Sequence, residues 1–145
     1  MSQSATDELK ASVDIVEETY EFCLAYAAKG VTAYMARTAD TQAREQLEKL
    51  ERALPGLGDV FLKVVEDLPD GGRDQYNGFI EVLRRDAESG RAAVQLVLAQ
   101  KNITSQMVDN LNGMIHLRAL LTDVFLIDEM LRPEADQPIH IQPAE

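Results

Sequence analysis

The chain has 145 residues, of which 25 are Asp or Glu and 14 are Lys or Arg, and its formal net charge is −11 with both histidines neutral. A chain of this length can bury enough apolar surface to fold without a disulfide or a structural metal. Its one cysteine, Cys23, excludes a disulfide-rich secreted scaffold. We expect Cys23 to be a small buried apolar residue, which suits a reducing compartment.

No stretch approaches the roughly 20 uncharged apolar residues of a membrane-spanning helix, because charged residues interrupt the most apolar segment, residues 119–130. The first residues lack the basic and apolar regions of a signal peptide, so we expect a cytoplasmic protein. The negative net charge repels phosphate groups and anionic lipids. We therefore expect no binding to nucleic acid or to a membrane surface.

Apolar spacings of three and four recur along the chain and no alternating strand pattern occurs, which predicts an all-α protein. The first helix is expected to begin near Ser4 or Thr6 and to end at Gly30. Apolar residues cover about half of its circumference, so it must contact more than one neighbour. Residues 31–39 show little periodicity and are interpreted as a connection with about one helical turn.

Asp40 is predicted to cap a second helix with its side chain. Apolar residues keep an unbroken three-four phase through Pro55, which favours a single helix over residues 41–68 with a kink at the proline. Two helices separated by a short turn at Pro55 are the alternative. Residues 69–72 contain one proline and two glycines, and they end this helix.

A third helix is predicted over residues 74–101 from the most regular apolar repeat in the chain. The phase of this repeat continues through Gly90, and small residues on the inward face, Ala87 and Gly90, would let a neighbouring helix approach closely. Glycine within a helix costs about 1 kcal/mol relative to alanine. A packing role would offset that cost.

A fourth helix is predicted to be capped by Thr104 or Ser105 and to run to Leu131. Four helices of similar length, joined mostly by short loops, are typical of an up-down-up-down four-helix bundle. We expect one bundle domain over residues 1–131. Residues 132–145 contain three prolines and little apolar content, and they are predicted to form a flexible tail.

Ferritin-like diiron bundles share this predicted architecture and place Glu-x-x-His pairs on facing helices. No such pair occurs in this sequence, because Gly113 stands three residues before His116 and His140 lies in the predicted tail. Motifs for a catalytic nucleophile, a phosphate loop or a Cys-x-x-Cys site are also missing. We therefore predict no metal, cofactor or catalytic residue, with a small-ligand or metal-binding bundle enzyme as the alternative.

Four polar residues, Asp109, Asn112, His116 and Asp123, fall on one face of the predicted fourth helix. Seven residues separate His116 from Asp123, about 10 Å along a helix axis, which is too far to hold one metal ion. We interpret them as a partly exposed polar face. Residues 116–122 also resemble the dimerisation helix around the phosphoacceptor histidine of sensor kinases, although the acidic neighbour and the proline of that motif are absent. A histidine phosphotransfer-type module is thus a further alternative.

Large apolar residues surround most of the predicted fourth helix, whereas a helix in a monomeric bundle needs only one apolar stripe. We interpret this surplus as a second buried contact, with a second copy of the chain or with another protein. Arg118 lies within the apolar arc, so a carboxylate partner is expected. The sequence thus predicts a dimeric, non-catalytic protein that acts through protein-protein interaction, as an adaptor, regulator or inhibitor. The candidate interface residues are Leu117, Arg118, Leu121, Phe125 and Leu126.

Overall fold

The computed structural model describes residues 3–68 and 73–131, apart from the side chains of residues 3, 115 and 116. These residues form helices joined by short connections and contain no strand, which confirms the all-α prediction. The predicted turn at 69–72 and the predicted tail at 132–145 lie outside the described residues. The helices are α1 (Gln3–Ala28), α2 (Ala33–Ala39), α3 (Thr41–Ala53), the 3₁₀ turn η1 (Leu54–Gly56), α4 (Leu57–Glu66), α5 (Arg73–Leu98), α6 (Ser105–Gly113) and α7 (Ile115–Leu131).

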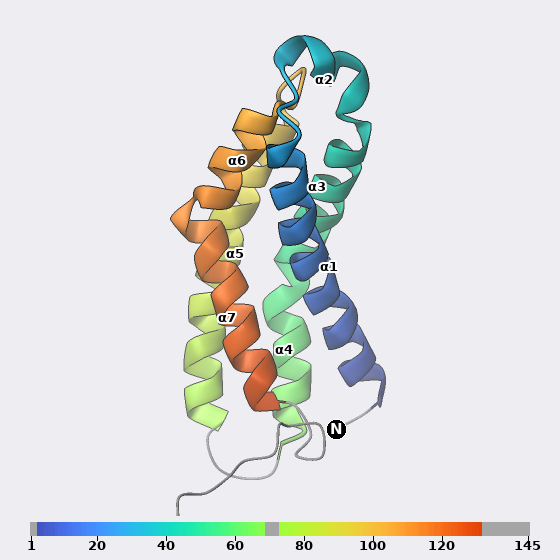
Figure 1. The fold of residues 1–145 in the computed structure, drawn as a ribbon. Helices are drawn as coiled ribbons and strands as arrows, with labels where there is room; N and C mark the ends of the chain where they lie inside the picture. Colours follow the sequence, from blue (N-terminus) through green and yellow to red (C-terminus); the bar gives the residue numbers. More distant parts are fainter. Residues whose placement is uncertain (1–2, 69–72, 132–145) are drawn as a thin grey trace, which may run out of the picture.

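The long helices lie side by side along one axis of an elongated molecule, and the short helix α2 lies at one end of it (Figure 1). The chain passes from α3 through η1 into α4 along one side, and from α6 into α7 along another. Buried apolar residues from α1, α3, α4, α5, α6 and α7 form one hydrophobic core between these helices.

Helix α1 contains the buried stripe expected from the sequence, with Leu9, Val13, Val16 and Cys23 all buried. The full burial of Cys23 confirms that it is a core residue, and this burial raises the pKa of its thiol to about 12. The helix ends at Ala28, and Gly30 follows with a φ of +65°. Glycine adopts this left-handed conformation without the steric cost that other residues meet, so it terminates the helix.

The segment interpreted as a connection contains a helix of seven residues, α2. The Thr32 hydroxyl caps this helix by accepting a hydrogen bond from the backbone N–H of Met35 at 3.3 Å. A helix of two turns is too short to display a helical period, so the sequence pattern indicated about one turn instead.

Helices α3 and α4 are separated by the 3₁₀ turn η1, which contains Pro55. Leu54 and Leu57 are both buried, so the apolar phase passes through the interruption as the sequence indicates. Pro55 occupies the start of η1, where its missing N–H costs no intrahelical hydrogen bond. The predicted kink of the helix axis at Pro55 stays a prediction.

The inward face of α5 repeats the predicted stripe, which includes Ala87 and Gly90. A Cβ atom added at Gly90 would meet Leu120 Cδ2 at 3.7 Å and Leu117 Cδ1 at 3.8 Å, which are ordinary van der Waals distances. Alanine therefore fits at this position. The expectation that small residues at this position let the neighbouring helix approach closely stays a prediction.

The predicted fourth helix is divided into α6 and α7. Thr104 caps α6 by accepting a hydrogen bond from the backbone N–H of Met107 at 3.1 Å, which confirms one of the two predicted caps. The helix ends at Gly113 because Met114 has an extended backbone, with φ of −66° and ψ of 138°. Apolar residues continue in phase across this break, so the apolar periodicity does not indicate it, although Gly113 is a poor helix former.

Candidate functional site

Helix α7 presents a buried face to the core and a second face that combines apolar and charged side chains. Leu120, Val124 and Ile127 are buried, whereas Phe125 and Leu126 keep 47% and 45% of their surface exposed. Large apolar side chains are exposed on other helices as well, with Tyr34 79% and Met35 46% exposed on α2, but the exposed apolar residues of α7 also adjoin an apolar groove. We call the exposed residues the α7 face: Arg118, Thr122, Phe125, Leu126 and Glu129.

An apolar groove lies beside the α7 face, between α5 and α7, with a volume of about 330 Å³. Met130, which contributes to its wall, is 57% exposed, and Val82 one turn further along α5 is 41% exposed. Leu126 belongs to both the groove and the α7 face, so the two apolar surfaces are continuous. The groove is lined by Gln75, Tyr76, Phe79, Leu126, Ile127 and Met130.

Two carboxyl groups, Asp86 on α5 and Asp123 on α7, meet at the contact between these helices. Burial, a hydrogen bond with Asp86 and the charge of Asp86 together raise the pKa of Asp123 to about 7. Among the described residues, no N–H or hydroxyl group donates a hydrogen bond to the buried Oδ2 atom of Asp123. Two ionised carboxylates can only accept hydrogen bonds, so the pair is satisfied when one carboxyl is protonated and donates to the other.

The predicted polar face does not form, because the break at Met114 places its members on two helices. Asp109 is exposed on α6, whereas Asn112 is buried and its Oδ1 has no hydrogen-bond partner among the described residues. Asp123 lies on α7 against Asp86. The backbone of His116 belongs to α7, and its side chain lies outside the described residues.

The structure separates the candidate interface residues into two groups. Leu117 is only 7% exposed and packs in the hydrophobic core, and Leu121 is partly buried. Arg118, Phe125 and Leu126 are exposed on α7. No described residue forms an ion pair with Arg118, so the carboxylate partner expected for it is not provided by the described part of the same chain.

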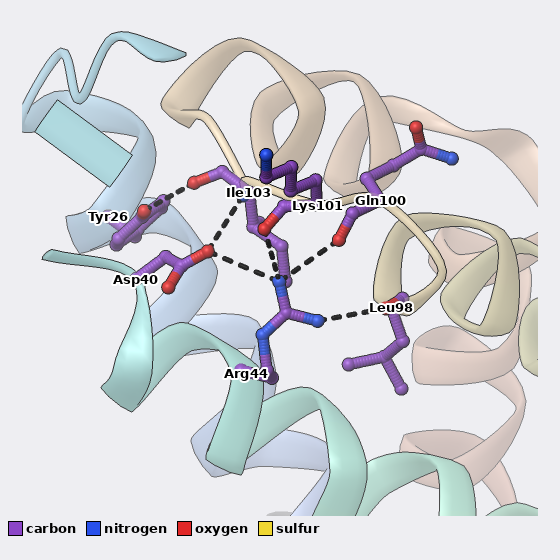
Figure 2. Close-up of polar contacts among 7 residues, drawn as sticks. All are labelled: Tyr26, Asp40, Arg44, Leu98, Gln100, Lys101 and Ile103. Carbon is purple, nitrogen blue, oxygen red and sulfur yellow. Dashed lines mark hydrogen bonds and ion pairs between the residues drawn. The ribbon is translucent and has the colours of Figure 1, made fainter. Parts of the chain in front are cut away.

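At the end of the molecule that carries α2, a polar network connects four helices (Figure 2). Asp40 does not cap α3 through its side chain as predicted. Its Oδ2 atom instead accepts hydrogen bonds from the backbone N–H of Ile103 at 2.9 Å and from Arg44 Nη2 at 3.2 Å. The Arg44 guanidinium also donates to the carbonyl oxygens of Leu98, Gln100 and Lys101, where α5 ends. Arg44 thus satisfies carbonyl groups that the end of a helix leaves unpaired.

The same network joins α1 to the start of α6. The Tyr26 hydroxyl donates to the carbonyl of Ile103 at 2.6 Å. The Ser105 hydroxyl accepts from the Val31 N–H and donates to the Tyr26 carbonyl, both at 2.6 Å. Sequence reasoning did not find this network, because its bonds connect residues more than fifty positions apart. The one local signal was the four-residue spacing of Asp40 and Arg44.

A wider groove of about 670 Å³ runs beside this network, between the end of α1 and the starts of α2 and α6. The hydroxyl groups that line it are already used, since Thr32 and Thr104 cap helices and Ser105 forms two hydrogen bonds. Small residues such as Ala27, Ala28 and Ala33 form much of the rest of its wall. This groove therefore offers few free polar groups to recognise a ligand.

Within the described part of the chain, no three His, Cys, Asp or Glu side chains gather closely enough to hold a metal ion. Among the described helices, none has the length and apolarity that crossing a membrane requires. The α7 face and the α5–α7 groove are therefore the surface features that call for a functional explanation. No known protein family, curated protein or solved structure matches the chain.

Proposed function

We propose that the chain is a non-catalytic helical-bundle protein that acts through protein-protein interaction, as an adaptor, regulator or inhibitor, and that its first partner is a second copy of itself. The observation that carries this proposal is the exposure of Phe125 and Leu126 on a helix whose opposite face is already buried in the core. Charge on the same face belongs to the proposal, because interfaces combine an apolar centre with a polar rim.

Burial of the α7 face would be energetically favourable. Full burial of a large apolar side chain contributes about 1.5 to 3 kcal/mol, so hiding the exposed half of Phe125 or Leu126 contributes about 1 kcal/mol each. A twofold dimer buries each patch twice, because both copies use the same surface. The α5–α7 groove enlarges the available apolar area through Met130 and Phe79.

The proposal includes the finer architecture expected from the sequence. We infer an up-down-up-down four-helix bundle with a kink at Pro55, in which α3 with α4 and α6 with α7 each take the place of one long helix. The order of elements and their side-by-side arrangement support this interpretation (Figure 1). A cytoplasmic location is proposed with it, because the buried Cys23 suits a reducing compartment.

Size-exclusion chromatography with light scattering tests the dimer. We expect the wild-type chain to be a dimer at micromolar concentration, and Leu126→Asp to be a folded monomer, because the new charge would have to be buried at the interface. Leu24→Asp is the matched control, since Leu24 is 51% exposed near the end of α1, beside the wider groove at the start of α2 and α6. This control should remain dimeric.

Buried residues provide the second comparison. Leu120→Asp is expected to unfold the chain, because Leu120 is fully buried in the core, whereas Phe125→Asp should keep the helical circular dichroism of the wild type. A wild-type chain that is monomeric throughout the micromolar range would overturn the proposed self-association. A dimer that persists in both Phe125→Asp and Leu126→Asp would move the interface away from α7.

A further inference from the structure

The α5–α7 groove presents apolar surface at the place where α7 ends. Tyr76 and Phe79 of α5 are partly buried against the core, whereas Met130 of α7 keeps 57% of its surface exposed. Apart from Gln75 and the hydroxyl of Tyr76, the side chains that line the groove are apolar. Its volume of about 330 Å³ is close to the lower limit of about 300 Å³ for ligand pockets. An occupant of this groove should therefore be small and apolar.

The sequence that follows α7 contains side chains of this kind. Met130 lines the groove and α7 ends at Leu131, so residues 132–145 continue from the edge of the groove. Within these residues, the large apolar side chains are those of Ile139 and Ile141. The three prolines of the segment disfavour a helix and favour an extended backbone. In an extended strand, residues two positions apart project to the same side and lie about 7 Å from each other. The two isoleucines can thus enter one apolar groove together.

The connection between α7 and the isoleucine pair is long enough to turn back onto the groove. Seven residues, 132–138, separate Leu131 from Ile139, and they allow a reach of up to about 26 Å. The groove residues of α7, from Leu126 to Met130, cover about one helical turn, or about 6 Å of the helix axis. A connection of this length holds the pair near the groove at an effective concentration of about a millimolar. A second copy at micromolar concentration is about a thousandfold more dilute, so the chain's own segment is the favoured occupant.

We propose that Ile139 and Ile141 of the chain's own segment, residues 132–145, occupy the α5–α7 groove beside Phe79 and Met130. Aromatic-lined grooves bind extended, proline-containing segments by accepting their side chains in this way. The inference goes beyond the proposed function and does not require self-association. It bears on self-association, however, because Leu126 belongs to both the groove and the α7 face. The segment and a second copy therefore compete for the same apolar surface.

Methyl NMR of the whole chain tests the contact. With the methyl groups of methionine and isoleucine labelled, we expect nuclear Overhauser effects between the Met130 methyl group and those of Ile139 and Ile141. The double variant Ile139→Ser with Ile141→Ser should lose these effects and shift the Met130 signal. The signal of Met35, which is 46% exposed on α2 at the opposite end of the molecule (Figure 1), should not move.

Two controls make the test specific. Ala135→Ser with Ala144→Ser changes the same segment outside the isoleucine pair, without changing the net charge, and it should leave the Met130 signal in place. Mixing one sample labelled on methionine with another labelled on isoleucine identifies contacts between copies. We expect no nuclear Overhauser effect between the two labels in this mixture, because the contact lies within one chain.

The competition is measured as the dissociation constant of the dimer by sedimentation equilibrium. A second copy must displace the segment from Leu126 in the wild-type chain, whereas it meets an uncovered groove in Ile139→Ser with Ile141→Ser. We expect the dissociation constant of this variant to fall by about threefold or more. The alanine-to-serine control should stay within about twofold of wild type.

The outcomes distinguish this inference from the proposed function. A wild-type chain without nuclear Overhauser effects between Met130 and the isoleucine pair overturns the docking, whatever its oligomeric state. Effects between differently labelled chains also overturn it, because they assign the groove to the segment of a second copy. A wild-type chain that is monomeric and shows the effects supports the docking and overturns the self-association. An unchanged dissociation constant in the isoleucine variant overturns the competition.

Discussion

The two ends of the molecule differ in how their polar groups are satisfied. At the end that carries α2, Asp40, Arg44, Tyr26 and Ser105 find their hydrogen-bond partners within the chain, and the loops between helices are held by buried bonds. Toward the other end, α7 and α5 leave apolar side chains exposed beside a groove, and a carboxyl oxygen of Asp123 has no hydrogen-bond donor within the described part of the chain. A surface whose polar groups are satisfied internally stabilises a fold. A surface with exposed apolar area beside a groove is available to a partner.

This comparison also distinguishes conspicuous sequence features from functional ones. Asp40 and Arg44 would attract notice as an acid-base pair, yet their hydrogen bonds to Leu98, Gln100 and Ile103 serve the connection between α5 and α6.

The largest predicted effect tests whether the polar network is structural. Asp40→Ala removes the acceptor of the buried Ile103 N–H and one partner of Arg44, and we expect the free energy of unfolding to fall by about 3 kcal/mol. Urea unfolding followed by circular dichroism measures this change. Asp59→Ala is the control, because Asp59 pairs with Arg84 through a carboxylate whose side chain is 71% exposed, and its loss should cost less than about 1 kcal/mol. Equal losses in the two variants would contradict the special role given to the α2 end.

The sequence predicted the helical class, the buried stripes of α1 and α5, and the Thr104 cap, because apolar period and capping are local properties. It did not predict the break at Met114, since apolar residues continue in phase on both sides of it. The sequence predicted that Asp40 caps a helix, because residue spacing indicates only hydrogen-bond partners close in sequence. The observed donor, the Ile103 N–H, is separated from Asp40 by 63 residues in the sequence.

The candidate interface was predicted only in part, because composition and periodicity describe one helix at a time. Composition indicated that α7 holds more large apolar residues than one core accepts, and Phe125 and Leu126 are indeed exposed. Leu117 was placed in the interface because periodicity gives no measure of where a core ends, and its contact with α5 became visible only in three dimensions. The carboxyl pair of Asp86 and Asp123 depends on the contact between α5 and α7, which no single-helix argument predicts.

The second prediction concerns that carboxyl pair and the pH dependence of stability. The folded chain raises the pKa of Asp123 from 3.8 to about 7, so between these values the folded state binds a proton that the unfolded state has lost. The free energy of unfolding should therefore fall as pH rises from about 4 to about 7 and level off above it. Because Asp123 is only partly buried, we expect a contribution of about 1 to 2 kcal/mol.

Asp123→Asn isolates this contribution, because the amide cannot ionise and can still donate a hydrogen bond to Asp86. Urea unfolding of wild type and variant across this pH range should give curves whose difference grows with pH, with the variant relatively more stable at pH 8. Parallel curves would show that the two carboxyl groups do not share a proton. The contrast between an α2 end with satisfied polar groups and an α5–α7 contact with an unsatisfied carboxyl group would then be weakened.

The smallest predicted effect asks how tightly the α5–α7 contact is packed. Gly90→Ala places a methyl group at ordinary distances from Leu117 and Leu120, so the gain in helix propensity should stabilise the fold by about 0.5 to 1 kcal/mol. Gly58→Ala is the matched comparison, because a Cβ there would lie 2.5 Å from Arg84 Nε and would displace the arginine that pairs with Asp59. Its propensity gain should be cancelled by that displacement. Thermal unfolding of both variants under one set of conditions measures the difference. A destabilised Gly90→Ala variant would mean that α7 packs against α5 as closely as α4 does. The α5–α7 contact would then have no room to adjust when a second copy covers the groove beside it.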